Sequence, residues 1–572
     1  MANKTIENCT VGEAYLALLA DRGVDYLFAN AGTDFAPLIE AFAKAETLGT
    51  AAPTPITVPH ENVAMAMAIG YALMTGRPQA VMVHVNVGTA NALCGLMNAA
   101  RGDVPVLFTA GRTPITEQGS AASRDIDIHW AQEMFDQAGV VREMVKWDYE
   151  LRNAPQLETV VDRALSIARS EPQGPVYLTL PREVLAEKID RFEFVSPSPR
   201  NAAAPNRPDD DTLDRAADII AGAENPMIIT TSSGRSAEAV AALGAVAERF
   251  AIPVIQYRPR NLCLPSNHPM HMGYEPGPLL EQADAVIVLD SMVPWLPAKT
   301  APPDDAKVIH IATDPLFSKL PIRGFPCDLA IAGSIVASLD ALDDALAGRV
   351  KGAKVRIGKR RTKFAEVRAV RAEQRRETIA RVKDQSPIHP HWITHCLNEI
   401  KTEDAVIVRE SQIAPGFMDL NQPHTFFKAG ASAGLGVGLG VGLGAKLAAR
   451  DRLVIVTEGD GSYMFANPVA AHYVSYAEKL PLLSVIYNNN RWGAVQNATM
   501  RLNPDGYAAR SNREPLTHFD GDAKYERAVE IYDGHGVRVT DPAKLPAALN
   551  KALDVVSGEG RQALLNVVCS AE

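Results

Sequence analysis

Two polar segments in the last third of the chain have residue types and spacing that suit a metal–phosphate site. Gly459-Asp460-Gly461-Ser462 closely follows the apolar residues 453–456, and Asn488-Asn489-Asn490 follows the apolar residues 482–486. Such runs predict buried strands of a parallel sheet, and these sheets bind ligands at the carboxyl ends of their strands. Asn489 lies 29 positions after Asp460, which suits one strand–helix–strand crossover. We therefore expect the two segments to lie side by side at one sheet edge.

The residue types predict a Mg²⁺ ion with a phosphate group beside it. A carboxylate oxygen from Asp460, an amide oxygen from Asn489, a backbone carbonyl, two phosphate oxygens and a water would complete an octahedral shell. Glycines let the backbone approach a phosphate, whose oxygens can accept hydrogen bonds from successive N–H groups and from Ser462. The alternative is a pair of unrelated turns. Two such segments in this order, each at a strand end, favour the metal site.

The same residues carry a resemblance to a known family. Gly459-Asp460-Gly461-Ser462 followed by Asn488-Asn489 resembles the thiamine-diphosphate motif of the acetolactate synthase, benzoylformate decarboxylase and benzaldehyde lyase enzymes. Members of that family usually place slightly fewer residues between the two halves, and we expect the extra length in the helix before Pro481. The resemblance covers essentially the whole chain. It implies that Asp460, Asn489 and the carbonyl of Arg491 bind Mg²⁺.

Glu61 is the candidate for the acid–base group. It begins residues 61–75, which are nearly all apolar and predict a buried helix. A glutamate at this place is also favoured by the helix N-terminal dipole. The segment resembles the glutamate-bearing helix of the same family, which implies that Glu61 shares a proton with a pyrimidine nitrogen of the cofactor. Burial would strengthen the hold of a carboxyl on that proton.

A glycine-rich segment has glycine at every second position from Gly434 to Gly444. Each glycine in a helix costs about 1 kcal/mol relative to alanine, so either close packing or cofactor approach must use the missing side chains. In the related family this stretch carries an apolar residue that supports the bent cofactor, and Leu435 is the best match. Ser411-Gln412 resembles the other diphosphate-binding turn of the family. The cofactor contacts implied by the resemblance are Glu61, Ser411, Gln412, Gly434, Leu435, Gly459, Asp460, Gly461, Ser462, Asn489, Trp492 and Gly493.

Two further residues are candidates for the substrate pocket. His84 lies at the end of the strand-like residues 80–85, where a lone histidine is more often structural. The segment resembles the benzoylformate decarboxylase stretch that carries an active-site histidine, and Thr33 falls where that family has a substrate-binding serine. The resemblance therefore implies catalytic roles for His84 and Thr33 in proton transfer or carboxylate recognition. His60 and His472 are weaker candidates.

Two features of related enzymes are missing from the sequence. Residues 110–113 (Ala-Gly-Arg-Thr) stand where pyruvate decarboxylases have paired histidines. The middle of the chain lacks the Arg-Phe-Asp-Asp-Arg-like sequence of flavin-containing acetolactate synthases. We therefore predict that no flavin is bound, which also disfavours true acetolactate synthase activity.

The strands and helices that must position these groups are predicted to form an α/β fold with three domains and mostly parallel sheets. Strand-like and helix-like segments alternate in three regions of the chain. The expected domains are residues 1–190, 206–347 and 387–572; the resemblance assigns pyrimidine binding to the first and diphosphate and Mg²⁺ binding to the last. A Pro/Ala-rich stretch at 195–205 separates the first from the second.

A basic segment joins the second domain to the third. Residues 351–383 contain 13 Lys and Arg against three Glu. A nucleic-acid-binding arm and a solvated connecting helix both fit this charge run. A thin apolar stripe through Phe364, Val367 and Val370 favours the helix, so we expect a connecting helix or linker at 348–386.

Composition and charge exclude several classes of protein. With 572 residues, 47% apolar, 22% charged and a net charge of −10, the chain fits a globular protein and disfavours a nucleic-acid binder. Six scattered cysteines without a C-x-x-C pair predict neither a zinc site nor disulfides. The N-terminus lacks a signal-peptide pattern, and the apolar residues 429–445 are too short to cross a bilayer. We expect a cytoplasmic protein without a membrane or nucleic-acid partner.

These predictions together describe a thiamine-diphosphate- and Mg²⁺-dependent decarboxylase or carboligase that acts on a small 2-oxo acid. The enzymatic alternative is a lyase of 2-hydroxy ketones or 2-hydroxyacyl-CoA, and a more remote one is a non-catalytic cofactor-binding regulator. The resemblance implies that Glu61 and Asp460 meet across a subunit interface. The working unit would then be at least a homodimer, and we expect a homotetramer.

Overall fold

The N-terminal region contains a six-stranded, wholly parallel sheet covered by helices on both faces. The computed structural model describes residues 2–511 and 514–571. The strand order is β3-β2-β4-β5-β7-β6, with β2 Tyr26–Asn30, β3 Thr54–Thr57, β4 Ala80–Val83, β5 Leu107–Arg112, β6 Asp148–Glu150 and β7 Val176–Pro181. The helices are α1 Val11–Asp21, α2 Ala36–Leu48, α3 Glu61–Thr75, α4 Val85–Asn91, α5 Leu93–Gly102, α6 Ile128–Ala131, α7 Leu157–Arg169 and α8 Arg182–Ala186. Beside this sheet, β1 (Ala2–Thr10) pairs antiparallel with β8 (Lys188–Ser196).

One strand of this sheet begins later than its sequence predicts. The apolar run at residues 104–109 predicts a strand from its first residue, but β5 starts at Leu107. The preceding residues cap α5 instead: Asp103 adopts a left-handed conformation, and the N–H of Val104 donates to the carbonyl of Ala99 at 2.9 Å. A helix C-cap of this kind takes its residues from the start of the following apolar run.

The C-terminal sheet repeats the N-terminal architecture. Its order is β15-β14-β16-β17-β19-β18, which places the strands in the same sequential pattern as the first sheet. Its strands, all parallel, are β14 Val406–Glu410, β15 Phe426–Lys428, β16 Val454–Gly459, β17 Leu483–Asn488, β18 His535–Val539 and β19 Ala563–Val568. Its helices are α14 Pro390–Ile400, α15 Gly438–Ala448, α16 Asp460–Phe465, α17 Pro468–Ala477, α18 Gly493–Leu502, α19 Tyr507–Ser511 and α20 Leu545–Leu553. The two ends of the chain therefore share one architecture.

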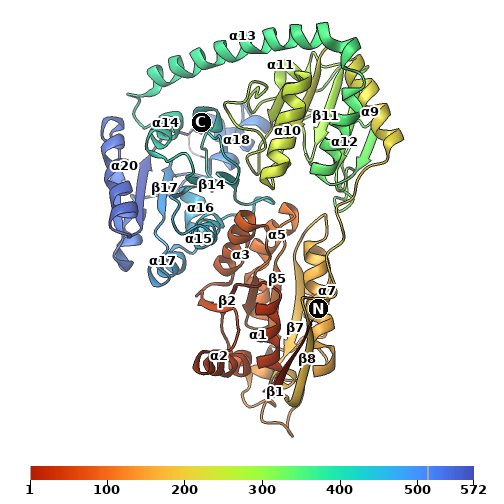
Figure 1. Cartoon of the computed structure of the whole chain (residues 1–572). Helices are drawn as coiled ribbons and strands as arrows, with labels where there is room; N and C mark the ends of the chain where they lie inside the picture. The colour runs from red at the N-terminus through yellow and green to blue at the C-terminus, as the bar shows by residue number, and fades with distance from the viewer. Residues whose placement is uncertain (1, 512–513, 572) are drawn as a thin grey trace.

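A third parallel sheet lies between these two in the sequence. Its order is β10-β9-β11-β12-β13, with β9 Pro226–Thr230, β10 Val254–Gln256, β11 Ala285–Leu289, β12 Lys307–Ala312 and β13 Leu329–Ala332. Its helices are α9 Asp210–Gly222, α10 Ala237–Phe250, α11 Gly277–Leu280 and α12 Ile335–Ala347. The basic segment forms one helix, α13 (Val350–Val382), which spans from the central region to the C-terminal region (Figure 1). The expected α/β fold with mostly parallel sheets is therefore confirmed.

Helix α15 is held between α3 and the C-terminal sheet, and its alternate glycines make this possible. A Cβ on Gly440 would lie 2.5 Å from the Cβ of Ala66, and one on Gly444 would lie 2.0 Å from the carbonyl oxygen of Met67, both on α3. A Cβ on Gly442 would meet Val456 of β16 at 2.3 Å on the other side. Successive glycines at every second position lie about 200° apart around a helix. Close packing on two opposite faces therefore accounts for the spacing.

The packing of α3 against α15 joins the N-terminal and C-terminal regions in one apolar core. Val63, Ala66, Leu439 and Val441 belong to the same buried cluster. The central region has a separate buried cluster around its own sheet. In the described part of the chain, no helix combines the length and the apolar character needed to span a membrane.

Candidate active site

The two polar segments predicted to bind metal and phosphate meet at the carboxyl edge of the C-terminal sheet. Strands β16 and β17 are direct neighbours, with Gly459 paired with Tyr487, so Asp460 and Asn489 each follow the end of an adjacent strand. The crossover between them contains α16 and α17. Asp460 begins α16, so the residues expected to form only a turn are the first turn of a short helix. Its free N–H groups can add to a phosphate-binding edge.

Asp460 is buried without a counter-charge. Its Oδ1 accepts a hydrogen bond from the N–H of Gly461 at 2.9 Å, while its Oδ2 is buried and has no partner in the described structure. Burial raises the pKa of this carboxyl to about 6, although the N–H groups of Gly461, Asn490 and Arg491 oppose the rise. A bound cation would satisfy the free oxygen and stabilise the charged form.

Of the paired asparagines, the second faces the edge. Asn488 is buried, and its amide donates to Oδ1 of Asn566 at 2.9 Å. Asn489 is half-buried, and its Oδ1 accepts from the N–H of Arg491 at 3.2 Å. A Cβ on Gly493 would lie 3.4 Å from the amide nitrogen of Asn489 and 4.0 Å from that of Gln412. The structure thus brings Gln412 next to Asn489 and Gly493, which lie more than 70 residues later in the sequence.

The adjacent strand β14 supplies a second unsatisfied group. Ser411 follows β14, and its Oγ is buried without a hydrogen-bond partner among the described residues. A buried polar atom left unpaired costs about 1–3 kcal/mol, so Ser411 Oγ and Asp460 Oδ2 both indicate a ligand at this edge. A diphosphate fits the hydroxyl, which can donate to it, and Mg²⁺ fits the carboxylate. In the described residues no group of three or more His, Cys, Asp or Glu could hold a metal, so a metal at this edge would need amide, carbonyl and phosphate ligands.

Trp492 and Gly461 pack face to face beside this edge. A Cβ on Gly461 would lie 2.2 Å from the indole ring of Trp492. The same ring contacts Phe519 at 4.9 Å and Phe465 at 5.7 Å between centroids. Trp492 therefore supports the Asp460 turn through its packing, and a contact with the cofactor stays a prediction. The positions of Gly459 and Ser462 at the start of α16 agree with a phosphate-facing turn.

The loop before α15 is tied to the N-terminal region by a residue that the sequence analysis missed. Asn98 of α5 donates to the carbonyl of Gly434 at 2.8 Å and accepts from the N–H and hydroxyl of Ser432 at 2.9 and 2.7 Å. Cys94 lies 3.7 Å from the carbonyl of Leu435. Gly434 and Leu435 are thus held where α5 meets the C-terminal region. The supporting role of Leu435 stays a prediction.

Two buried carboxyl groups at the start of α15 were also missed. Glu410 and Glu458 are paired residues at the ends of β14 and β16. Glu410 accepts from the N–H groups of Gly436, Val437 and Gly438, and Glu458 accepts from that of Leu439 at 2.9 Å. Burial raises the pKa of both, that of Glu410 to about 7, and the proximity of Glu410 raises that of Glu458 further. The sequence feature that could have identified these two residues is a glutamate at the end of each apolar run.

Glu61 lies at the start of α3 as expected. It is only 7% exposed, and its Oε2 accepts a hydrogen bond from the amide of Asn91 at 3.2 Å. His60 caps the helix by accepting from the N–H of Asn62. The carboxyl therefore sits in a largely buried environment next to the end of α4. Asn91 is an additional residue that the sequence analysis did not single out.

His84 forms a buried pair with an aspartate that the sequence analysis missed. Its Nδ1 lies 2.6 Å from Oδ1 of Asp34, which is 3% exposed. Two glycines make room for the pair: a Cβ on Gly32 would lie 2.1 Å from Nδ1 of His84, and one on Gly111 would lie 1.7 Å from Oδ2 of Asp34. The amide of Gln132 lies 3.2 Å from the other ring nitrogen, Nε2. The hydrogen bond to Asp34 raises the pKa of His84, against an opposing effect of burial.

Two other candidates from the sequence, Thr33 and His472, have different surroundings. Thr33 is exposed, and its hydroxyl lies 3.3 Å from Nε2 of the buried His129. His472 is buried between the hydroxyl of Tyr463 at 2.9 Å and the side chain of Gln562 at 2.8 Å. Both of its ring nitrogens are therefore occupied, which indicates a structural role. Asp34 and Thr33 are neighbours in sequence, so Thr33 lies beside the His84 pair.

The predicted site residues form two groups. Glu61, His84 and Thr33 belong to the N-terminal region, and the negative charge of Glu61 contributes to the raised pKa of His84. The metal and phosphate group belongs to the edge of the C-terminal sheet. Among residues 2–511 and 514–571, no hydrogen bond joins Glu61 to Asp460. The expectation that these two meet across a subunit interface stays a prediction.

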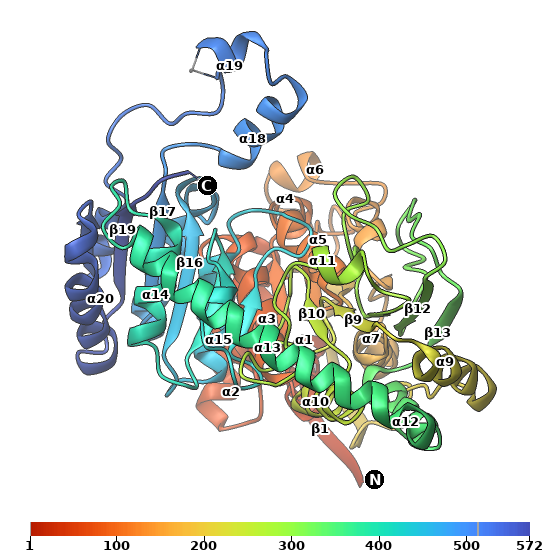
Figure 2. The same cartoon turned by 90° about the horizontal axis from the view of Figure 1, so that it is seen from above.

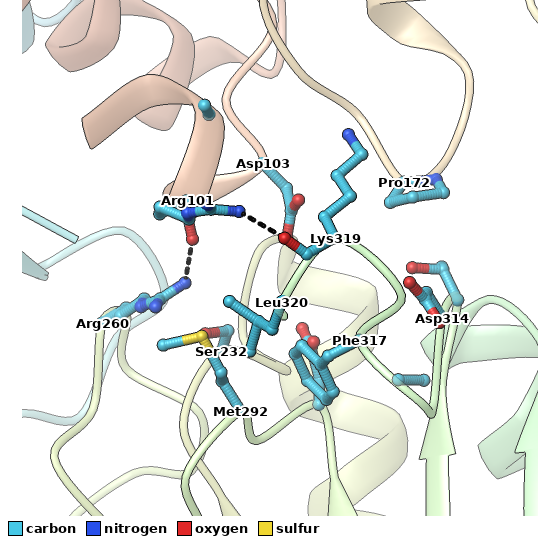
Figure 3. A pocket seen from close by; sticks show the side chains of 14 residues that line it. Arg101, Asp103, Pro172, Ser232, Arg260, Met292, Asp314, Phe317, Lys319 and Leu320 are labelled. Atoms are coloured by element: carbon cyan, nitrogen blue, oxygen red, sulfur yellow. Dashed lines mark hydrogen bonds between the residues drawn. The ribbon is translucent and has the colours of Figure 1, made fainter. Parts of the chain in front are cut away.

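A separate cavity lies between the N-terminal and central regions (Figure 3). The guanidinium of Arg260 donates to the carbonyl of Arg101, and Arg101 donates to the carbonyl of Lys319 at 3.1 Å. The three basic side chains that line the cavity are matched by three acidic ones, Asp103, Asp290 and Asp314. None of the predicted site residues lines this cavity, so it is distinct from the site described above.

Comparison with known proteins finds three family models in order along the chain. They are described as the thiamine pyrophosphate enzyme N-terminal TPP binding domain, central domain and C-terminal TPP binding domain, and they match residues 9–140, 213–342 and 410–567.

Curated relatives are similar over nearly their whole length. The sulfoacetaldehyde acetyltransferase of Castellaniella defragrans is 24% identical over 100% of this chain and 96% of its own. The acetolactate synthase large subunit of Lactococcus lactis is 24% identical over 94% of this chain and 90% of its own. Among solved structures, the benzoylformate decarboxylase of Polynucleobacter necessarius is 20% identical, with a TM-score of 0.77 and 99% of both chains covered. That likeness establishes the fold.

Proposed function

Because the chain belongs to the thiamine pyrophosphate enzyme family, we propose that it is a thiamine-diphosphate- and Mg²⁺-dependent enzyme that acts on a 2-oxo acid. The reaction would be decarboxylation, ligation of the resulting fragment to a second carbonyl compound, or both. The observation that carries the proposal is the pair of buried, unsatisfied oxygens, Asp460 Oδ2 and Ser411 Oγ, at the ends of neighbouring strands.

The residues at this edge would hold the metal and the diphosphate. Asp460, Asn489 and the carbonyl of Arg491 would bind Mg²⁺, and Ser411, Gln412 and the N–H groups at the start of α16 would bind the diphosphate. Bound thiamine diphosphate supplies a nucleophilic carbon that can add to a carbonyl and hold the electrons released when carbon dioxide leaves. The residues of the chain bind and orient this group and move protons.

Glu61 would hold a proton shared with the pyrimidine of the cofactor. Its burial and its hydrogen bond from Asn91 fit this role, because they hold the carboxyl away from water beside the end of α4. The hydrogen bond also fixes the orientation of the carboxyl.

The paired His84 supports the choice of a 2-oxo acid. Asp34 stabilises the charged imidazolium, which can attract the carboxylate of such a substrate and can deliver a proton from Nε2 after carbon dioxide has left. Thr33, beside Asp34, would donate a hydrogen bond to the substrate.

We also propose that the active unit is a dimer, or a tetramer built from dimers. Three apolar side chains next to the Asp460 turn are largely exposed in the single chain: Met464 at 43%, Phe465 at 54% and Val469 at 51%. Two further exposed apolar side chains lie near Gln132, namely Trp130 on α6 and Phe135 in the loop that follows. Contiguous exposed apolar surface of this kind is typical of protein interfaces.

Calorimetry with thiamine diphosphate and Mg²⁺, followed by a substrate panel, tests the proposal. The panel contains aliphatic and aromatic 2-oxo acids, which are assayed for carbon dioxide release, and acyloins, which are assayed for aldehyde release. Sulfoacetaldehyde is included as a further candidate substrate. We expect cofactor binding that needs Mg²⁺ and carbon dioxide release from at least one acid. Aldehyde from acyloins without carbon dioxide from any acid would instead favour the lyase, and no cofactor binding would overturn the proposal.

A further inference from the structure

A large cavity lies beneath the connecting helix α13, which crosses from the central to the C-terminal region (Figures 1 and 2). We call it the α13 cavity. It is lined by one side of α13 at residues 368–378, by residues 266–274 of the central region and by residues 415–421 of the C-terminal region. Its volume is about 680 Å³, which suits a small metabolite. None of the predicted cofactor or substrate residues lines it.

The lining of the α13 cavity is strongly basic. Four arginines of α13 take part, namely Arg368, Arg371, Arg375 and Arg376, whose spacing brings them to the same side of the helix. Among the described residues that line the cavity, Asp419 is the one acidic side chain. His271 adds no charge, because burial and the nearby arginines lower its pKa to about 3. An anion would be attracted to this cavity.

Three of the four arginines already have acceptors. Arg375 donates to Asp419 at 2.8 Å and to the carbonyl of Phe417 at 2.9 Å. Arg368 donates to the carbonyl of Asn267 at 3.0 Å, and Arg376 donates to Glu373 on its own helix.

Arg371 differs from the other three. In the described part of the chain it forms no ion pair and donates no hydrogen bond, although it is half-buried. Its guanidinium packs on Gly273, where a Cβ would lie 2.2 Å from Nη2 and where the backbone φ is +93°. Gly273 therefore leaves room for a guanidinium group that has no hydrogen-bond acceptor in the described structure.

Two more donors next to Arg371 are unsatisfied. The hydroxyl of Tyr274 and Nε2 of His271 are buried and have no hydrogen-bond partner in the described structure. The two rings pack edge to face, 5.2 Å apart. Burial raises the pKa of Tyr274, so the hydroxyl keeps its proton, and the neutral imidazole can carry a proton on Nε2. Unsatisfied buried groups are rare in folded proteins and indicate a missing partner.

We propose that the α13 cavity binds a phosphate monoester whose phosphate group is held by Arg371, Tyr274 and His271. A phosphate carries nearly two negative charges and three acceptor oxygens, which match the three unsatisfied donors and the surplus of arginine. The planar guanidinium can bind two of these oxygens at once. A carboxylate has one charge and two oxygens, and would leave a donor unmet. The site is independent of the proposed catalytic function.

Binding of glycerol 3-phosphate to the protein loaded with thiamine diphosphate and Mg²⁺ tests the proposal. Loading keeps the probe out of the diphosphate site, and KCl holds the ionic strength constant. Calorimetry should show saturable binding that Arg371→Ala weakens by about 10- to 100-fold and Tyr274→Phe by about 3- to 10-fold. Malonate, a dianion without a phosphate, should bind much more weakly.

Lys359→Ala is the matched control, because it removes one positive charge from an exposed position of the same helix outside the cavity. It should leave the affinity nearly unchanged. Equal weakening by Lys359→Ala and Arg371→Ala would mean diffuse attraction and would overturn the proposal, as would the absence of saturable binding or equal affinity for malonate. Tyr274→Phe and Arg371→Lys keep the packing, so an unfolded Arg371→Ala protein would not prevent the test.

Discussion

At the scale of single residues, the site depends on buried polar groups whose partners are incomplete or unusual. In the described structure Oδ2 of Asp460 and Oγ of Ser411 have no hydrogen-bond partner, Asp34 holds His84, and Glu61 has one hydrogen bond from Asn91. Buried polar groups of this kind are costly unless a ligand or a neighbouring group stabilises them. Substitutions that alter one atom can therefore separate binding from proton transfer.

Glu61→Gln should reduce turnover by roughly 100-fold or more, since general acid–base groups contribute about 10² to 10⁴ in rate. The amide has the size of the carboxyl but cannot exchange its proton in the same way. Calorimetry should show thiamine diphosphate still binding. Glu40→Gln, on the exposed face of the neighbouring α2, serves as the control. Unchanged turnover in Glu61→Gln would remove this residue from the mechanism.

Asp34→Asn should lower kcat/KM by roughly tenfold or more and move its alkaline limb to lower pH. Asp34 raises the pKa of His84, so removal of its charge lets the imidazolium lose its proton at lower pH. The pH profile of kcat/KM measures this shift. Asp125→Asn removes the exposed carboxylate beside His129 and should leave the limb in place. If the alkaline limb of the pH profile of kcat/KM does not shift in Asp34→Asn, His84 does not act in its charged form.

Asp460→Asn should make the cofactor-free protein more stable and abolish its stabilisation by cofactor. The buried carboxylate lacks a counter-charge without Mg²⁺, and an amide avoids that cost. Saturating Mg²⁺ and thiamine diphosphate should add about 2.7 kcal/mol at a hundredfold excess over Kd in the unmodified protein and nothing in the variant. Thermal unfolding measures both effects, with the exposed Asp505→Asn as the comparison. A retained cofactor effect would contradict the role of Asp460.

At the scale of elements, the contact of α3 with α15 is what brings the N-terminal and C-terminal regions into one core. Each helix approaches the other at glycine: Gly70 of α3 faces the backbone of Val441, and Gly444 of α15 faces that of Met67. Helix backbones can come this close only where side chains are missing. The start of α3 carries Glu61, so the packing also sets where this carboxyl lies.

Gly444→Ala should destabilise the protein by roughly 1–3 kcal/mol or more, because the added Cβ would lie 2.0 Å from the carbonyl oxygen of Met67. Gly358→Ala on α13 is the control, since nothing lies within 4 Å of its Cβ position. That change should stabilise by up to about 1 kcal/mol, from helix propensity alone. Chemical denaturation measures both. Equal effects would show that the α3–α15 contact does not need the glycine.

At the scale of the whole molecule, the single chain leaves apolar surface exposed around the site. Besides the residues beside the Asp460 turn, the segment of α18 and α19 extends away from the C-terminal region (Figure 2). Leu502 and Tyr507 on this segment, and Leu516 after it, are more than 70% exposed. Exposed apolar surface of this extent fits self-association. A second copy of the chain would cover it.

Co-expression of Glu61→Gln with Asp460→Asn should restore activity that neither variant has alone. If the site forms between subunits, a mixed dimer has one site with both residues intact, and the mixture keeps roughly a quarter of the full activity at random pairing of two-site dimers. Differently tagged subunits allow the mixed species to be purified and assayed. A mixed dimer without activity would place Glu61 and Asp460 of one chain in the same site. The unmodified protein with both tags is the control.

Much of the local structure follows from sequence alone. The apolar runs at 226–230, 285–289 and 563–568 each form a strand over their whole length, and α3 begins at Glu61. Such runs are long enough, and their ends clear enough, for local pattern to decide. The cofactor class was also readable, since Gly459-Asp460-Gly461-Ser462 and Asn489 fall at the ends of neighbouring strands.

The pairing of distant polar groups could not be read in the same way. Asp34 meets His84 because β2 and β4 are neighbours, and Glu410 faces Glu458 because β14 and β16 are. The unsatisfied Arg371 results from the path of α13 over a glycine of the central region. The sequence by itself determined the elements, the cofactor class and the strand-end residues, which depend on local pattern. Only the tertiary structure decided which polar groups meet and which lack partners, because these depend on the packing of elements far apart in the chain.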